Sequence, residues 1–164
     1  MANLWQRWIV NPVMGLLKMG ADPDRLAWSL ALGLVVGVNP LLGSTTLVAL
    51  GLASLFRLNL VASQVGNHAV YPLELVMFPV FIKVGSLVFA TPNLPLEGHE
   101  LWHAASRHPW DTTRLLWTWE WHALVIWAVF AVLAAPVIAL SSEPMLRKMA
   151  ERARRGQAVE GEKL

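Results

Sequence analysis

The sequence has no cysteine, a single tyrosine and few charged residues. Without cysteine, the chain can form neither a disulfide nor a thiolate site for metal or redox chemistry. Charged residues make up 15% of the 164 residues and hydrophobic residues 55%, and the mean hydropathy is +0.48. This composition is typical of a membrane protein and argues against a nucleic-acid-binding domain.

The longest stretch without any charge runs from Leu26 to Phe56. A bilayer core about 30 Å thick requires about 20 apolar residues in a helix, so this stretch is long enough to enter a membrane. Pro40 has no N–H, so the sequence predicts that one helix ends at Asn39 and that a second begins at Pro40, with Asn39 as its cap. We expect a re-entrant pair of half-helices, with two full spans as the alternative. The polar residues after the break are Gly43, Ser44, Thr45 and Thr46.

The N-terminal residues form an amphipathic pattern that extends from Leu4 to Leu17. This pattern predicts either a helix in the headgroup region, anchored by Trp5 and Trp8, or a helix packed against the rest of the bundle. Gly20 is expected to end it. Asp22 and Pro23 then predict a new helix, with Asp22 as the cap and Pro23 in the first turn.

Several short motifs follow one another between about residues 16 and 90 of the sequence. They are Gly20-Ala21-Asp22-Pro23, Gly37-Val38-Asn39-Pro40, Arg57-Leu58-Asn59 and Tyr71-Pro72-Leu73-Glu74. Together they resemble the domain of unknown function 2062 family of small bacterial membrane proteins. The resemblance implies a membrane domain, joined in some relatives to glycosyltransferase modules, and therefore a link to lipids or lipid-linked substrates. It implies no catalytic residue.

A second apolar stretch, Leu60 to Ala90, contains polar residues at helical spacing. Gln64, Asn67, Tyr71 and Glu74 are separated by three, four and three residues, so a continuous helix would place them on one face. Pro72 predicts a bend at Tyr71. An ionisable residue in a membrane segment indicates function, because burying it unpaired is costly. Glu74 is therefore either a functional carboxyl group or a paired one that fastens this segment to the Asn39 break.

Asn39-Pro40 and Tyr71-Pro72 lie near the middle of the two apolar stretches. Paired Pro-interrupted segments indicate a transporter binding site near the membrane midplane. Free N–H groups at helix N-termini attract anions, so we expect an anionic lipid headgroup; the alternative is that the hydroxyl groups bond within their own helix. The predicted substrate-binding residues are Asn39, Pro40, Gly43, Ser44, Thr45, Thr46, Arg57, Asn67, Tyr71 and Glu74.

The segment from 91 to 121 contains His99-Glu100-Leu101-Trp102-His103, which matches the zinc-binding pattern H-E-x-x-H. The pattern follows Pro95 and Gly98, so His99 would lie in a frayed first turn. The many tryptophans of this region favour an interfacial segment instead. We therefore expect no metal, with His99 and His103 as the only candidates.

The last apolar run, Ala123 to Leu140, predicts a membrane span, with a bend at Pro136. A basic helix is expected to start at Glu143, and this places the C-terminus in the cytoplasm, next to anionic lipid. A polar tail without structure is expected after Gly156. The predicted division is a membrane domain at 1–142, with its core at 20–90, its interfacial segment at 91–121 and its span at 123–140, followed by a cytoplasmic part at 143–164.

The sequence therefore predicts an all-α, multi-pass protein of the bacterial inner membrane. Its predicted function is to bind or translocate an amphipathic, anionic lipid or lipid-linked substrate, as a homo-oligomer, without a cofactor and without catalysis. The first alternative is a membrane anchor or scaffold for a partner enzyme such as a glycosyltransferase. The second is a zinc-dependent hydrolase that uses His99, Glu100 and His103.

Overall fold

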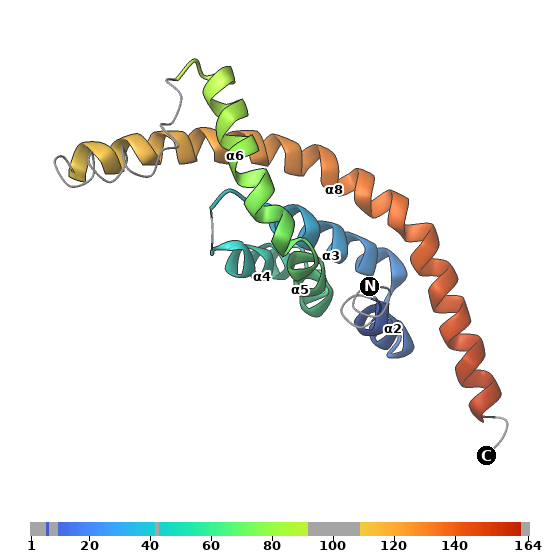
Figure 1. The fold of residues 1–164 in the computed structure, drawn as a ribbon. Coiled ribbons are helices and arrows are strands. Elements are labelled where there is room, and N and C mark those ends of the chain that lie inside the picture. Colours follow the sequence, from blue (N-terminus) through green and yellow to red (C-terminus); the bar gives the residue numbers. More distant parts are fainter. Residues whose placement is uncertain (1–5, 7–9, 42, 92–108, 162–164) are drawn as a thin grey trace.

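The protein is all-helical, as the sequence predicts. The computed structural model describes residues 6, 10–41, 43–91 and 109–161, and this part of the chain contains no strand. In Figure 1, α8 is a long curved helix, α3 lies along it, and α6 crosses it. The helices are α2 (Asn11–Lys18), α3 (Pro23–Val36), α4 (Thr45–Leu55), α5 (Leu60–Ala69), α6 (Tyr71–Val88) and α8 (Pro109–Gly161).

Two helices begin at the caps that the sequence predicts. The Asp22 carboxylate accepts a hydrogen bond of 3.2 Å from the Asp24 N–H at the start of α3, and Pro23 occupies the first turn. The Asn59 side chain accepts one of 2.9 Å from the Ala62 N–H at the start of α5. Each cap satisfies one of the N–H groups that a helix leaves free at its first turn.

Three helices end at a residue with left-handed backbone conformation. The residues are Gly20 after α2, Arg57 after α4 and Ala90 after α6, with φ of 86°, 54° and 51°. After α4, the Leu58 N–H reaches back to the Ala53 carbonyl over 2.8 Å, so the helix closes in a Schellman motif. Glycine adopts this conformation without steric cost, whereas Arg57 and Ala90 each cost about 1 kcal/mol.

The break after α3 is wider than the sequence predicts. α3 ends at Val36, and α4 starts at Thr45 rather than at Pro40. Gly43 explains the late start, because its φ of +81° cannot be part of a right-handed helix. The second break is narrow, because Val70, the C-cap of α5, is the single residue between α5 and α6.

α3 and α5 run parallel and approach each other through glycine. The contacts pair Ser29 with Asn59, Gly33 with Ser63, and Gly37 with Asn67. A Cβ on Gly33 would lie 2.0 Å from the Ser63 carbonyl oxygen, and one on Gly66 would lie 2.5 Å from the Leu30 carbonyl oxygen. Glycines at such positions let helix backbones approach closely, as in the small-residue interfaces of membrane helices.

Two small hydrophobic clusters hold the other helices. In the first, Val13, Leu16 and Leu17 of α2 are buried against α3, α5 and the C-terminal part of α8. α2 therefore packs against the bundle, one of the two predicted arrangements; Trp5 and Trp8 lie outside the described residues. In the second, Phe81 of α6 packs against Phe130 of α8, with ring centroids 5.7 Å apart.

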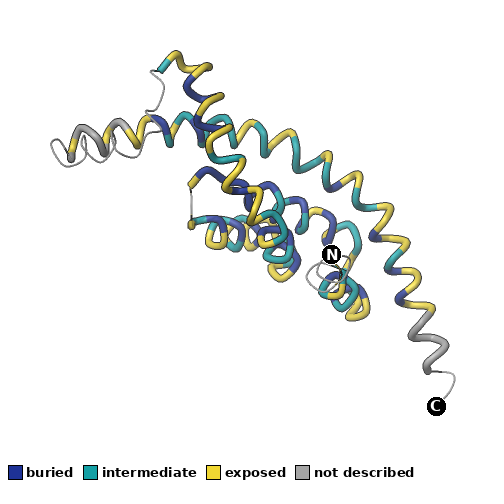
Figure 2. The backbone as a smooth tube through the Cα atoms, viewed as in Figure 1, coloured by how far each residue is buried: buried dark blue, intermediate teal, exposed yellow. Residues whose placement is uncertain are grey.

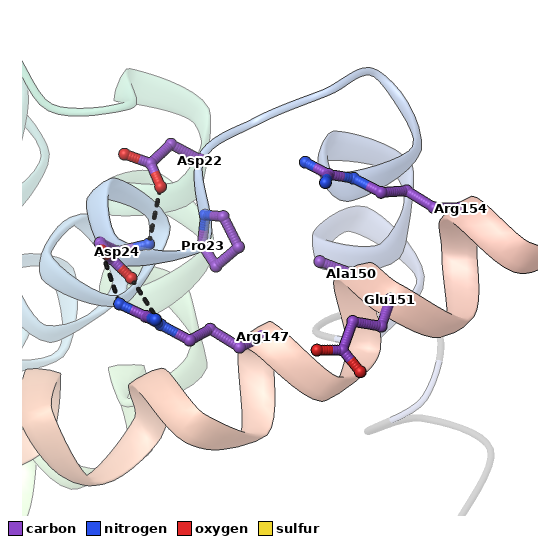
Figure 3. A pocket seen from close by; sticks show the side chains of 7 residues that line it. All are labelled: Asp22, Pro23, Asp24, Arg147, Ala150, Glu151 and Arg154. Carbon is purple, nitrogen blue, oxygen red and sulfur yellow. Dashed lines mark hydrogen bonds and ion pairs between the residues drawn. The ribbon is translucent and has the colours of Figure 1, made fainter.

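α8 is one helix where the sequence predicts a span, a separate basic helix and a tail. It passes through Pro136 and Pro144 and continues beyond Gly156 to Gly161. The residues after Pro144 include Ala, Glu and Arg, which favour helix and carry α8 onward. In the C-terminal part of α8, Arg147 donates two hydrogen bonds of 3.1 and 3.0 Å to the Asp24 carboxylate (Figure 3). Arg147 also pairs with Glu143.

Two helices are long and apolar enough to cross a membrane: Tyr71–Val88 and the part of α8 at Leu116–Arg155. The second contains the predicted span Ala123 to Leu140, and the first lies within the apolar stretch Leu60 to Ala90. Many of their large hydrophobic side chains are exposed, as the yellow segments of Figure 2 illustrate. Soluble proteins rarely expose apolar faces this large.

The contact between α3 and α5 predicts a stability effect. We expect Gly33→Ala to lower the free energy of unfolding by about 2 kcal/mol or more, because the added methyl group meets backbone that cannot move aside. Thermal unfolding in detergent measures this. Gly51→Ala in α4 is the control, since nothing lies within 4 Å of its Cβ position, and it should be neutral or stabilising. Equal effects of the two substitutions would contradict the prediction.

Replacing the left-handed residue after α4 with glycine should stabilise the protein. We expect Arg57→Gly to raise the free energy of unfolding by about 1 kcal/mol, because glycine relieves the backbone strain at φ 54°. Arg57→Ala keeps the Cβ atom and should leave the strain in place. Unfolding followed by tryptophan fluorescence in detergent compares the two variants. A glycine variant no more stable than the alanine variant would show that no strain is stored there.

Candidate functional site at the helix break

The link between α3 and α4 is a turn that is held by its own side chains and is buried at Asn39 and Pro40. Asn39 is 3% exposed, and its side-chain oxygen accepts a hydrogen bond of 2.7 Å from the Leu41 N–H. The Asn39 N–H donates to the Val36 carbonyl over 3.0 Å. Pro40 is fully buried, whereas Leu41 and Gly43 are exposed, so the turn leads from the inside of the bundle to its surface. Asn39 therefore accepts a hydrogen bond from the next turn of the chain, as predicted, but it is not a helix cap, because α4 begins at Thr45 with Ser44 as its N-cap.

Polar side chains from α5 and α6 converge on this link. Asn67 and Glu74 are each 4% exposed. The side-chain amides of Asn67 and Gln64 donate to Thr46, at 3.5 Å to its hydroxyl and 3.4 Å to its carbonyl. The Glu74 carboxyl group lies close enough to the Gly43 N–H to interact with it. The break and the second apolar stretch therefore form one polar cluster, which we define as Asn39, Gly43, Thr45, Thr46, Gln64, Asn67 and Glu74.

Three buried oxygens of the polar cluster have no hydrogen-bond partner among the described residues. They are Gln64 Oε1, Asn67 Oδ1 and Glu74 Oε1. All three accept hydrogen bonds, so the complementary group is a hydroxyl, an N–H group or a cation. Leaving a buried acceptor unsatisfied costs about 1–3 kcal/mol, and a bound donor would recover part of this.

The N–H groups at the break are less free than the sequence suggests. The Leu41 N–H is bonded to Asn39, and the Gly43 N–H faces Glu74. The Ser44 hydroxyl donates to the Leu41 carbonyl over 2.8 Å, so it bonds locally, as in the alternative interpretation of the sequence. The cluster thus offers acceptors more than donors.

Two predicted site residues lie away from the polar cluster. The Tyr71 side chain is 63% exposed. Val70, with φ of −104° and ψ of 8°, interrupts the helix, so Tyr71 does not share the face of Asn67. Arg57 follows the far end of α4, and eleven helical residues separate it from Ser44, about 17 Å.

The zinc-binding pattern at His99 and His103 lies outside the described residues. Within the described part of the chain, no group of three His, Asp or Glu side chains could hold a metal ion. His122 is described, and its ring stacks on Phe89 with centroids 4.2 Å apart.

The sequence interpretation missed the residues that hold the polar cluster in place. Ser29 is fully buried, accepts a hydrogen bond of 2.8 Å from the Asn59 N–H and thereby fixes α5 against α3. Trp127 of α8 donates to the Val35 carbonyl over 3.0 Å. The four-residue spacing of Ser29, Gly33 and Gly37 was the available signal, because small residues at this spacing mark close helix contacts.

Comparison with known proteins finds one family. A family model described as an uncharacterized protein conserved in bacteria (DUF2062) matches residues 6–155. No curated protein and no solved structure matches the chain. The match includes every residue of the polar cluster and extends beyond the motifs at residues 16 to 90.

The hydrogen bonds of the link predict that Asn39 contributes more to stability than Ser44 does. We expect Asn39→Ala to lower the free energy of unfolding by about 1 kcal/mol or more, because it removes the hydrogen bond between the buried Asn39 side chain and the Leu41 N–H. Ser44→Ala should change it by less than about 0.5 kcal/mol, since the Leu41 carbonyl keeps its bond to the Ser44 N–H. Thermal unfolding in detergent measures both. The prediction is wrong if Asn39→Ala is as mild as Ser44→Ala.

Proposed function

We propose that this chain, which belongs to the bacterial DUF2062 family, is an integral membrane protein that binds or translocates an amphipathic, anionic lipid or lipid-linked substrate. The observation that carries the proposal is the polar cluster with its three unsatisfied buried oxygens. Apolar helices surround it. Burying polar groups in such surroundings costs free energy, so their presence indicates a function. The proposal assigns no catalysis, cofactor or nucleic acid to the chain.

The exposed faces of α6 and α8 support placement in a membrane. Leu75, Val76 and Leu87 of α6 and Val132 and Leu133 of α8 are each at least 60% exposed. Lipid is the solvent that suits such surfaces. The basic residues Lys148, Arg152 and Arg155 follow on α8 and favour a cytoplasmic C-terminus in the inner membrane.

The lengths of α3 and α4 support a re-entrant hairpin. Their 14 and 11 residues give about 21 and 17 Å, both shorter than a bilayer core of about 30 Å. Asp22 and Arg25 line the same pocket as Arg57 and Asn59, so the start of α3 lies beside the turn after α4. If this end of the hairpin lies at the membrane surface, the polar cluster lies near the midplane, where transporters bind their substrates.

The chemistry of the polar cluster indicates which part of the lipid headgroup it binds. Its free groups are acceptors, and the Glu74 carboxylate would repel a phosphate. We therefore infer that the cluster receives hydroxyl groups of the headgroup, such as those of a glycerol or a sugar, rather than its phosphate. Glu74 accepts from these groups or takes up a proton while the headgroup passes.

A scaffold is the second candidate, and the wide apolar faces of α6 and α8 favour it. Such faces suit other membrane helices as well as lipid, so a partner enzyme or further copies of the chain could cover them. A single chain of this size offers few helices to enclose a pathway, so transport would use a homo-oligomer. In a scaffold the polar cluster would only fasten α4, α5 and α6 together.

Substitution of Glu74 separates the two candidates. In vesicles of phosphatidylcholine that contain a fluorescent phosphatidylglycerol, we expect the purified protein to move the probe between leaflets. Glu74→Ala should slow this movement about tenfold or more, because a hydrogen bond to a charged group contributes about 1.5–3 kcal/mol. Lys83→Gln on the same helix is the control, since the Lys83 side chain is exposed. Movement at the normal rate in a folded Glu74→Ala variant would leave the scaffold as the function.

A further inference from the structure

An apolar groove lies beside the α3–α4 hairpin, between α3, α4 and α8. Its volume is about 480 Å³, within the range of ligand pockets. Trp28, Leu32 and Val36 form its wall on α3, and Trp127 and Ala131 form its wall on α8. All of its lining residues are apolar. The hydrogen bond from Trp127 to the Val35 carbonyl holds the α8 wall against α3.

A basic pocket of about 480 Å³ lies at the start of α3. Arg25 and Arg57 line it together with Asp22 and Asn59. The Asp22 carboxylate accepts from the Asp24 N–H, and neither arginine has an ion-pair partner among the residues that the structure describes. Two arginines against one aspartate leave the pocket with one net positive charge.

The basic pocket lies at one end of the apolar groove. Leu58 lines both, and Arg57 stands between Phe56 and Leu58, which line the groove. On α3, Arg25 precedes Trp28 by three residues, so the two occupy adjacent positions on one face of the helix. A molecule lying along α3 would therefore place a charged end at Arg25 and an apolar end along Leu32 and Val36.

We propose that the groove and the basic pocket together bind one anionic phospholipid. An acyl chain fills the groove, and the phosphate lies between Arg25 and Arg57. Charge complementarity selects this occupant, because guanidinium groups bind phosphate through paired, charge-assisted hydrogen bonds. A helix from a second copy of the chain would cover the groove but leave both arginines unpaired.

The phospholipid site rests on the proposed function and adds a second lipid-binding position, separate from the polar cluster. The phospholipid site lies at the Arg57 end of α4, and the polar cluster lies at the Thr45 end. A lipid would bind first through its phosphate at the two arginines. Its hydroxyl groups would engage the polar cluster only when the headgroup moves along the hairpin.

The test is a lipid titration by native mass spectrometry of the full chain in detergent, with phosphatidylglycerol and phosphatidylcholine of the same acyl chains. We expect tighter binding of phosphatidylglycerol. Arg25→Gln and Arg57→Gln should each weaken it about tenfold and weaken phosphatidylcholine less, because the choline cation offsets the charge of the phosphate that the arginines bind. Ala131→Phe fills the groove and should weaken both lipids.

Two matched controls accompany these variants. Lys83→Gln removes an exposed cation of α6 that does not line the basic pocket, and Ala128→Phe adds the same ring to an exposed position of α8 outside the groove. Neither should change lipid binding. Unfolding temperatures equal to that of the unmodified protein confirm that each variant is folded.

Three results would overturn the phospholipid site. These are equal affinity for the two lipids, normal phosphatidylglycerol binding by Ala131→Phe, and a dimer whose formation excludes lipid from the groove. The Glu74→Gln variant tests the phospholipid site separately from the proposed function. This variant should bind phosphatidylglycerol normally but fail to translocate it. Loss of binding in the arginine variants with normal translocation by Glu74→Gln would leave the phospholipid site standing and the role of the polar cluster refuted.

Discussion

The close approach of α3 and α5 is the contact on which the rest of the structure depends. Gly33 and Gly66 bring the two backbones so near that a methyl group on either would overlap a carbonyl oxygen. Because the helices run parallel and the chain returns through α4 between them, both reach their proline-containing breaks at the same end. Gly37 then lies against Asn67 and Val70, so the first break contacts the second.

This arrangement explains why polar groups are buried in so apolar a chain. A break in a helix frees N–H and carbonyl groups, which must find partners when the break is buried. Asn39 and Ser44 provide partners within the link itself, and Gln64 and Asn67 of α5 bond to Thr46 in the first turn of α4. The polar side chains bring more acceptors than the link can satisfy. The surplus oxygens are therefore a consequence of how the break is stabilised, and they make it receptive to a donor.

Local signals in the sequence were reliable, and distant contacts were not. Asp22, Asn39 and Asn59 act on N–H groups two or three residues away, so residue type and position suffice to predict their bonds. The start of α4 was predicted five residues early because Pro40 fits a first turn, whereas Gly43 prevents one. Glycine contacts between α3 and α5 depend on residues thirty positions apart, and the pair Asp24–Arg147 on residues 123 apart. Neither follows from a local pattern.

Distant contacts also determine the chemistry of the candidate site, and local sequence patterns do not predict them. Residue types placed Asn39, Asn67 and Glu74 in one region, but only packing reveals that their free atoms are acceptors and that Arg57 lies at the other end of α4. Positive charge and hydrogen-bond acceptors are thus separated along the hairpin by about 17 Å. A ligand with a phosphate and hydroxyl groups would meet them in succession rather than together. Binding and translocation should therefore respond to different substitutions in this protein.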